Sequence, residues 1–469
     1  MDAQTIDVDR SRTSSRTWVL VLASVASFMC ALDTLVVASA LTTIQRDLGA
    51  TVEELNWTVN AFNLALAVLM MPAAAIGDRF GRRKVFGIGL ALFSVASAVC
   101  AIAPHVEVLV VARAVQGAGA AVVTSLGLTL VGAAYPAERR GTAIGILQGI
   151  SGLAVLAGPG LGGAVTTGVG WEWIFWLNVP IGLAVIPLVF VKVRESRGDD
   201  TALDLRGVVL IAAAALALVW TLSRGNDIGW SSAEVVLGFA AAVLLTAGFV
   251  RVQRRVREPL LPARLFRASG FIAGNIATIG LFAGIFGGVF FFAQFLQVGL
   301  GFTALQAGLG LMPWTSPLFV IGPLCGMLAD RIGNRPLLVA GVTLKALGFG
   351  WIALIAAPGM SYGELVVPLF VAGVGGSMAL PAAANAVVGA VAHADVGKAA
   401  GSNSMLRELG GVLGLAVMVA VFSGAGDVTS PGSFVAGFAP ALGFCTALVA
   451  CGAIAAAFVP RHGGPAAAH

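Results

Sequence analysis

The chain has 469 residues, of which 58% are hydrophobic and only 11% are charged, with a formal net charge of +5. An average soluble domain is about one quarter charged, so this composition excludes a soluble globular protein and indicates an integral membrane protein. The basic residues lie in short segments between long apolar runs, which argues against nucleic acid as a partner.

The first sixteen residues are polar and include Arg10, Arg12 and Arg16. The apolar run that follows is longer than a signal-peptide core and contains Asp33, so we predict an uncleaved first membrane helix behind a tail at 1–16. A membrane-spanning helix needs about 20 apolar residues, and barrel strands would alternate over about ten. The chain therefore reads as an all-α integral membrane protein with fourteen spanning helices, at 17–43, 55–76, 85–103, 106–132, 142–168, 172–191, 205–222, 233–250, 270–298, 303–329, 336–356, 363–390, 400–424 and 435–458.

The basic residues predict how these helices are oriented. If the N-terminus is inside, 23 of the 28 Lys and Arg residues fall in inner segments and three within helices or at their ends, whereas the outer segments hold only Arg46 and Arg224. Cytoplasmic segments of membrane proteins carry this excess of positive charge. We therefore predict a multi-pass protein of the cell (plasma) membrane with both termini in the cytoplasm.

A sequence repeat divides the chain into two halves. The segment "GDRFGRRKVFGIGL" (77–90) is echoed by "ADRIGNRPLLVAGV" (329–342), and each follows the second helix of a six-helix set. We predict six helices at 17–191, a linker with two extra helices at 192–269, six helices at 270–458 and a tail at 459–469. Parallel halves of this 6+2+6 kind are typical of transporters.

The chain lacks the motifs that several kinds of chemistry require. The chain contains neither GxxxxGK[ST] nor HExxH, none of its four histidines falls inside a predicted helix, and its five cysteines lie in apolar runs without a CxxC pair. We therefore expect no nucleotide hydrolysis, metal site, disulfide or bound cofactor, and no enzyme. An ion gradient is then the expected source of energy.

Two charged residues fall well inside predicted helices. Burying a lone carboxylate such as Asp33 costs at least about 2.5–3.5 kcal/mol, so it needs a proton or a partner. Asp33 and Arg113 lie at similar depth, roughly 12–15 Å from the outer surface at 1.5 Å per residue, and could pair. One interpretation is a fixed structural ion pair. The other is a protonation site, which burial would drive towards the neutral form and Arg113 towards the charged form.

The charged stretch "GDRFGRR" (77–83) lies between two apolar runs. Topology alone accounts for Arg79, Arg82 and Arg83, but not for Asp78, Gly77 or Gly81. Glycines at this spacing permit a tight turn, and a carboxylate is stabilised at a helix N-terminus. We expect Asp78 to dock against the segment "GKAAGSNS" (397–404) of the second half and so to hold the inner side shut.

The predicted helix at 142–168 is rich in glycine and contains a proline. Gly149, Gly158, Gly162 and Gly163 allow close helix packing, and Pro159 should bend the helix. Close packing alone would also account for the glycines.

Further polar residues fall inside predicted helices. Glu408 and Arg407 lie near the inner end of the helix at 400–424, where they could reach the membrane interface. No partner can be named for Lys345, which lies near mid-membrane. Polar side chains that could line a central cavity, or simply bond a neighbouring helix, are Asn60, Asn63, Gln116, Gln148, Asn275, Gln294, Gln297 and Asn385.

Five motifs resemble those of the major facilitator superfamily, in its fourteen-helix drug–proton antiporter branch. They are "ALDTLVVASALTTIQRDLG" (31–49), "GDRFGRR" (77–83), "RAVQGAGAA" (113–121), "GISGLAVLAGPGLGG" (149–163) and "RELGGVLGLAV" (407–417). The resemblance implies that the 77–83 loop is an inner latch between the halves and that the 149–163 motif marks an exporter. It also implies that Asp33 carries the proton, tuned by Arg113. Glu408 replaces a glutamine found in many relatives and would add a second titratable group.

The resemblance thus implies proton-coupled export of hydrophobic small molecules, by alternating access of two six-helix bundles in a monomer within the lipid bilayer. One alternative is an exporter of a single metabolite or antibiotic. Another is a transport-inactive membrane sensor, which would have no need to keep Asp33, Arg113 and the glycine motif.

Overall fold

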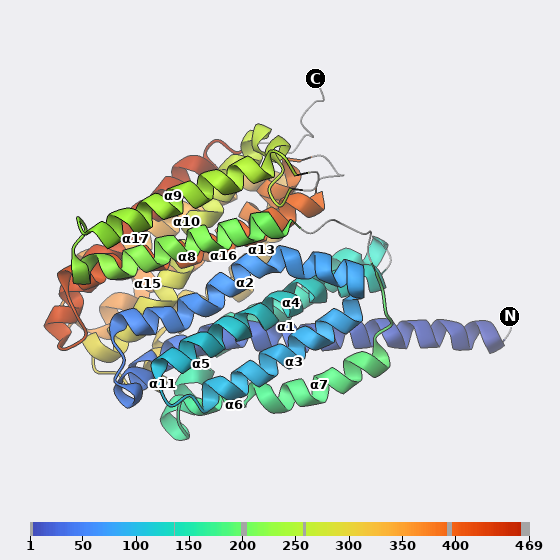
Figure 1. The fold of residues 1–469 in the computed structure, drawn as a ribbon, viewed down its shortest axis with the longest axis horizontal. Coiled ribbons are helices and arrows are strands. Elements are labelled where there is room, and N and C mark those ends of the chain that lie inside the picture. Colours follow the sequence, from blue (N-terminus) through green and yellow to red (C-terminus); the bar gives the residue numbers. More distant parts are fainter. Residues whose placement is uncertain (1–2, 136, 198–203, 257–258, 392–395, 461–469) are drawn as a thin grey trace.

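The computed structural model describes residues 3–135, 137–197, 204–256, 259–391 and 396–460, except for some side chains within helices. In this part of the chain the secondary structure is helical throughout, and long helices lie side by side along the long axis of the molecule (Figure 1). The first helix continues beyond the others at the N-terminal end. It begins at Ala3 and so includes most of the polar segment 1–16.

The N-terminal half, our name for α1 to α7, contains four long helices, a fifth rich in glycine, and a broken span. Their bounds are α1 (Ala3–Leu48), α2 (Val52–Phe80), α3 (Arg82–Ala101), α4 (Val106–Ala134), α5 (Ala137–Gly168), α6 (Glu172–Trp176) and α7 (Asn178–Lys192). The sequence predicted one helix over 172–191, whereas the structure interrupts it at Leu177. The break places the Asn178 side chain at the start of a new helix, inside the protein.

A helical hairpin follows, and then the C-terminal half, our name for α10 to α17. The hairpin is α8 (Leu205–Ile228) and α9 (Ala233–Gln253). The C-terminal half contains the 3₁₀-helix η1 (Ala263–Arg267), α10 (Ser269–Gln294), the π-helix η2 (Phe295–Gly299), α11 (Ala304–Gly310), α12 (Met312–Thr315), α13 (Pro317–Ile332), α14 (Asn334–Ile355), α15 (Tyr362–Gly389), α16 (Val396–Ala425) and α17 (Pro431–Ala456).

Prolines explain where the helices bend or break. Proline lacks a backbone N–H and its ring clashes with the preceding turn. The span predicted at 303–329 is divided into α11, α12 and α13, with Pro313 second in α12 and Pro317 first in α13. The helix α2 bends by 51° at Pro72.

The protein is a multi-pass membrane protein. In the part that the structure describes, 12 helices are long and apolar enough to cross a membrane, and α2 makes 13 if its two bent parts form one span. The helix α5, several of whose side chains lie outside the description, adds a further 32-residue helix. The count of fourteen and the domain boundaries stay predictions.

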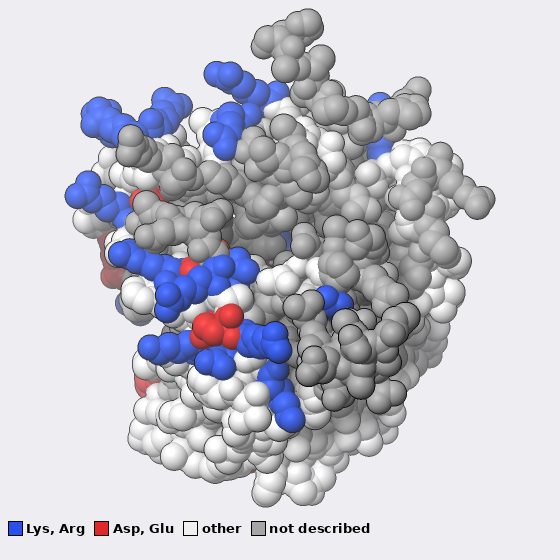
Figure 2. Space-filling model, turned by 90° about the vertical axis from the view of Figure 1, so that its right-hand side faces the viewer, with Lys and Arg blue, Asp and Glu red and all other residues white. Residues whose placement is uncertain are grey.

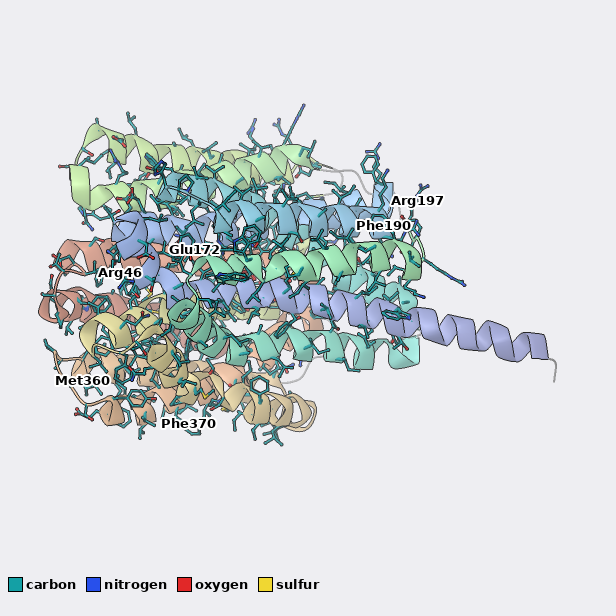
Figure 3. The ribbon with its side chains drawn as sticks, turned by 90° about the horizontal axis from the view of Figure 1, so that it is seen from below. Arg46, Glu172, Phe190, Arg197, Met360 and Phe370 are labelled. Carbon is teal, nitrogen blue, oxygen red and sulfur yellow. The ribbon has the colours of Figure 1, made fainter. Side chains whose placement is uncertain are left out.

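The two ends of the helix bundle differ in charge. Figure 2 shows the end at which α2 turns into α3, where Lys and Arg side chains gather with few acidic ones between them. We call it the basic end; the start of α3 and the ends of α7 and α9 lie here (Figure 1), so it includes Arg82, Arg83, Arg194 and Arg254. In Figure 3, Arg197 and Phe190 lie near this end, whereas Arg46, Glu172 and Met360 lie near the other, which we call the opposite end.

The halves meet along α2 and α16 and again at the opposite end. Leu64 and Val68 of α2 share an apolar cluster with Leu409 and Val412 of α16, and α8 covers this seam by packing on both helices. At the opposite end α5 packs on α11. There Gln297 of η2 donates a hydrogen bond to the Ser39 carbonyl of α1 at 3.4 Å and also accepts one from the Thr42 hydroxyl.

Candidate functional site

The centre of the N-terminal half contains a buried ion pair between α1 and α4. The Arg113 guanidinium contacts the Asp33 carboxylate directly through Nη1 and Oδ2, and each side chain is only 1% exposed. The structure thus brings together the two charges whose depths suggested a pair. A charge buried this deeply is stable only if it is paired and hydrogen-bonded.

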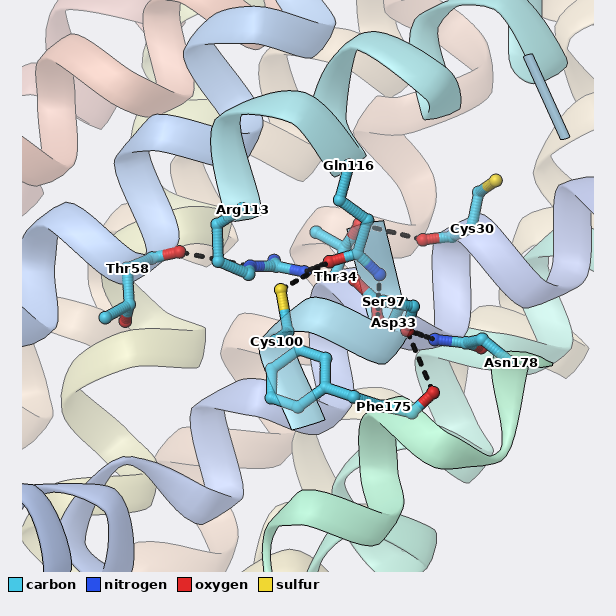
Figure 4. Close-up of polar contacts among 10 residues, drawn as sticks. All are labelled: Cys30, Asp33, Thr34, Thr58, Ser97, Cys100, Arg113, Gln116, Phe175 and Asn178. Carbon is cyan, nitrogen blue, oxygen red and sulfur yellow. Dashed lines mark hydrogen bonds and ion pairs between the residues drawn. The ribbon is translucent and has the colours of Figure 1, made fainter. Parts of the chain in front are cut away.

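Two amides complete the shell of the Asp33 carboxylate (Figure 4). Its Oδ1 accepts hydrogen bonds from Gln116 Nε2 on α4 and from Asn178 Nδ2 on α7, both at 2.9 Å. Asn178 also donates to Ser97 Oγ on α3 at 3.0 Å, and Ser97 donates to the Phe175 carbonyl at 2.8 Å. Side chains of α4 and α7 therefore bind the carboxylate of α1 directly, and α3 joins the network through Asn178.

The Arg113 side chain also has several contacts besides its ion pair. Its Nε donates to the Thr58 carbonyl of α2 at 3.2 Å, and Nη1 also donates to Gln116 Oε1 at 2.8 Å. The guanidinium carbon lies 4.1 Å from the centre of the Phe62 ring and 5.7 Å from that of Phe175, both within cation–π range. Hydrogen bonds and ring contacts thus hold the Arg113 guanidinium in addition to its ion pair with Asp33.

Sequence reasoning missed Asn178 and Ser97, and it assigned Gln116 to a cavity. Asn178 follows a cluster of aromatic residues, and nothing in its neighbourhood sets it apart from an asparagine that starts a helix. Gln116 is fully buried and belongs to the ion-pair network. One signal was available, because Gln116 lies one helical turn after Arg113 and so shares its face.

The turn at 77–83 binds the end of α7 in its own half. Asp78 accepts a hydrogen bond from Arg82 Nε at 2.6 Å, and the backbone N–H of Arg82 donates to the Ser196 carbonyl at 2.9 Å. Gly77 packs against Leu126 of α4, and the Arg79 guanidinium lies 5.6 Å from the centre of the Phe80 ring. Among the described side chains Asp78 pairs with Arg82, and its expected docking on residues 397–404 stays a prediction, because the side chains at 397–398 lie outside the description.

Glu195 is the residue that orders this turn, and the sequence did not single it out. Its carboxylate accepts hydrogen bonds from the backbone N–H groups of Arg83 at 2.9 Å and Lys84 at 3.2 Å, which are free donors at the start of α3. Gly81, at φ +109°, turns the chain between α2 and α3. A Cβ at Gly81 would lie 2.8 Å from the Glu195 carboxyl carbon, so glycine is needed both for the backbone angle and for the approach of the carboxylate.

We expect Glu195→Ala to loosen the first turn of α3. Losing a carboxylate that caps a helix costs about 0.5–2 kcal/mol, and the loss should be local. Hydrogen–deuterium exchange should show faster exchange of the Arg83 and Lys84 amides and no change near Ala101. The matched control is Glu107→Ala, which removes an exposed carboxylate from α4. Equal protection of the α3 amides in both variants would contradict the capping role.

The glycine motif of α5 lies where three helices meet. A Cβ at Gly158 would lie 2.8 Å from Leu35 Cβ, and one at Gly162 would lie 2.4 Å from Ser39 Oγ, so both glycines face α1. Gly163 faces the other half: its Cβ would lie 2.3 Å from the Ala304 carbonyl oxygen of α11. Gly149 and Pro159 lie on the same helix, with side chains outside the description, and the bend at Pro159 stays a prediction.

Two other ionisable residues lie inside the C-terminal half. Glu408 is 12 residues into α16, about 18 Å along the helix, and it is buried; its place near the inner end of the membrane span stays a prediction. It pairs with its neighbour Arg407 at 3.0 Å. Lys345, for which the sequence offered no partner, donates to the Leu281 carbonyl at 3.0 Å, and its Nζ lies 5.3 Å from the centre of the Phe349 ring.

The remaining cavity candidates are scattered. Asn63 lines a cavity of about 20 Å³ between α1, α2 and α10, and its Oδ1 is buried without a hydrogen-bond partner. Gln297 joins the halves, as described above. The others lie as follows: Asn60 donates to Asn56 Oδ1, Asn275 accepts from Asn403, Gln294 donates to the Phe290 carbonyl, Asn385 is exposed, and the side chain of Gln148 lies outside the description.

Relatives of this chain are export and resistance proteins. The tetracenomycin C resistance and export protein of Streptomyces glaucescens is 35% identical over 418 residues, 88% of this chain and 77% of that protein. The multidrug resistance protein Stp of Mycobacterium tuberculosis is 34% identical over 86% of this chain and 75% of its own. The cephamycin export protein CmcT of Amycolatopsis lactamdurans is 34% identical over 90% of this chain and 88% of its own.

Solved structures share the fold. The xylose transporter XylE from E. coli aligns with a TM-score of 0.62 at 15% identity, covering 94% of this chain and 98% of its own. A POT family transporter in complex with 5-aminolevulinic acid aligns with a TM-score of 0.70 at 12% identity, covering 93% and 94%. The sequence model of the Major Facilitator Superfamily matches residues 23–415. With its helical architecture over the described residues and its export-protein relatives, the chain belongs to the Major Facilitator Superfamily, a family of membrane transporters.

Proposed function

We propose that this protein is a proton-coupled antiporter that exports hydrophobic small molecules across the cell membrane. It works as a monomer without a cofactor, and the basic end faces the cytoplasm. The observation that carries the proton coupling is the Asp33–Arg113 pair, a carboxylate buried at 1% exposure inside a membrane helix. Ionisable residues inside membrane spans are expensive and mark proton or substrate pathways.

The charge asymmetry supports the proposed orientation. The basic end carries Arg82, Arg83, Arg194 and Arg197, and short cytoplasmic segments of membrane proteins are enriched in such residues. On this orientation the contacts between α5 and α11 close the outer side. Export then requires those contacts to open while the seam along α2 and α16 rearranges.

The proposed proton step uses only residues of the N-terminal half. In the structure the Asp33 carboxylate accepts hydrogen bonds from Arg113, Gln116 and Asn178. A proton arriving at Asp33 neutralises it and weakens its hold on the guanidinium. Because α1 also contacts α5 and η2, a shift of Asp33 is transmitted to the outer contacts.

The second candidate is an exporter of one antibiotic. The observation that favours it is the naming of the relatives: two are named for a single compound, tetracenomycin C or cephamycin, whereas Stp is named a multidrug resistance protein. A transport-inactive sensor is a third and weaker candidate, since it would not require a paired carboxylate in its core.

Efflux from vesicles tests the proposal. The purified protein is reconstituted into liposomes, a pH gradient is imposed, and a panel of fluorescent cationic and neutral amphiphiles is followed. We expect gradient-dependent movement of at least one compound and, at the same time, proton movement in the opposite direction. Movement of one compound alone favours the single-antibiotic exporter, whereas proton-independent movement contradicts antiport.

We expect Gly163→Val to open the opposite end and stop transport. Valine would drive its side chain into the Ala304 carbonyl and the Leu305 backbone, which cannot move away without separating α5 from α11. Cysteines at Asp47 and Ser361, spin-labelled in a Cys451→Ser background, should report a longer distance across this end. Gly160→Val is the control, because a Cβ at Gly160 meets no atom within 4 Å. An unchanged distance in Gly163→Val would show that this contact does not close the outer side.

A further inference from the structure

A groove lies between the α8–α9 hairpin and the C-terminal half. It has a volume of about 1010 Å³ and is lined by α8, α9, α16 and α17, with one residue from α10. α8 packs on α16 and α2, whereas α9 packs on α8 and has the smallest buried share of the candidate spans in the described part of the chain. One wall of the groove is therefore a helix that stands apart from the C-terminal half, within the membrane.

The walls of the groove are apolar for the thickness of about one leaflet. Along α9 the lining runs from Phe239 through Val243 and Ala247 to Arg251, which is 12 residues or about 18 Å. Half of a bilayer's hydrocarbon core is about 15 Å. Leu413 of α16 and other aliphatic residues line the facing wall. The groove thus matches an acyl chain in length and chemistry.

One end of the groove is strongly positive. Arg251, Arg254 and Arg255 line it at the basic end, and all three are exposed. Within the described ranges, no carboxylate forms an ion pair with any of them. This end therefore offers three cationic donors at the depth of lipid headgroups, beside the apolar part of the groove.

Hydrogen bonds hold the end of α9 that carries these arginines. Gln253, which lies between them and is buried, donates to the Asp204 carboxylate at the start of α8 and accepts from the backbone N–H of Leu261 at 3.0 Å. The end of α9 is thus tied to the start of α8 and to the chain that follows. A fixed cluster of arginines binds an anion with less loss of side-chain freedom than a mobile one.

We propose that this groove is a binding site for an anionic phospholipid, whose phosphate contacts Arg251, Arg254 and Arg255 and whose acyl chain lies between α9, α16 and α17. Basic pockets between helices at the cytoplasmic side suit anionic headgroups. The apolar walls contact the acyl chain, and a free phosphate has no acyl chain to bury there. The bound lipid fills the space between α9 and α17 and ties the hairpin to the C-terminal half.

Native mass spectrometry of the purified full-length protein tests the site. The protein is titrated with phosphatidylglycerol and with phosphatidylcholine of the same acyl chains. We expect a phosphatidylglycerol adduct that survives delipidation better than phosphatidylcholine. Arg251→Gln/Arg254→Gln should weaken it about 30-fold, which corresponds to about 1 kcal/mol per arginine near the membrane surface. Equal retention of the two lipids by the unmodified protein would overturn the proposal.

Two matched controls separate a site from general attraction. Arg194→Gln/Arg197→Gln removes two exposed charges from the same end outside the groove and should leave the adduct intact. Ala247→Trp fills the groove and should abolish the adduct, whereas Leu244→Trp places the same ring on the exposed side of α9 and should not. Three results would each contradict the lipid site. They are an equal loss of the adduct in both arginine double variants, an adduct that persists in Ala247→Trp, and displacement of the bound lipid by excess glycerol phosphate.

Discussion

Asp33→Asn is expected to reduce proton-driven export to the background of protein-free liposomes. Asparagine has nearly the same shape, and its oxygen can still accept hydrogen bonds from Gln116 and Asn178. It cannot take up or release a proton at any working pH. Transport that depends on the pH gradient should therefore disappear, while exchange of labelled substrate at equal pH on both sides persists.

The measurement needs a control for insertion and for charge. Asp47→Asn removes an exposed carboxylate from the same helix, where its partner is the exposed Arg46 at 3.4 Å, and it should transport normally. Both variants should elute from gel filtration as the unmodified protein does. Full gradient-driven efflux by a folded Asp33→Asn protein would remove Asp33 from the proton pathway and leave a structural ion pair.

Arg113→Met is expected to cause the largest loss of stability of any single change considered. Methionine keeps much of the length but leaves the Asp33 carboxylate facing only two amides, and it frees the Thr58 carbonyl. Removing one member of a buried ion pair costs about 3–5 kcal/mol, because the other charge stays buried without compensation. Unfolding in detergent should show this decrease, and Arg194→Met at the surface should show almost none.

The double variant Asp33→Asn/Arg113→Met separates the pair from its surroundings. Once the carboxylate is neutral, the uncompensated charge is gone, so the double variant should regain much of the stability that Arg113→Met loses. A double-mutant cycle measures this coupling directly. If the stability losses of the two single variants simply add in the double variant, Arg113 acts through its contacts with Thr58 and Phe62 and not through Asp33.

Several features of the site could be predicted from the sequence because they depend on local composition. Long apolar runs predicted the spanning helices, and the cost of burying a carboxylate predicted that Asp33 needs a partner at its own depth. Arg113 was the candidate, and the structure pairs them. The family resemblance rested on short motifs, and the family match over residues 23–415 confirms it.

Other features depend on which segments meet, and a single sequence does not encode that locally. Nothing near Asn178, Ser97 or Glu195 sets them apart, yet they complete the Asp33 shell and cap α3. Each acts on a residue about 80 or more positions away along the chain. Their roles arise only when α3 and α7 pack together.

The amino-acid sequence by itself determined the membrane class, the helices and the presence of a buried charge, because hydrophobicity and the cost of desolvation act on each residue wherever it folds. Only the tertiary structure decided that Asn178 bonds Asp33, that Glu195 caps α3, and that Gly163 meets α11. It also decided that α9 stands apart from the C-terminal half with three arginines at one end of a groove. Hydrogen bonds, ion pairs and steric contacts act over a few ångströms, so they follow the packing of helices rather than the order of residues.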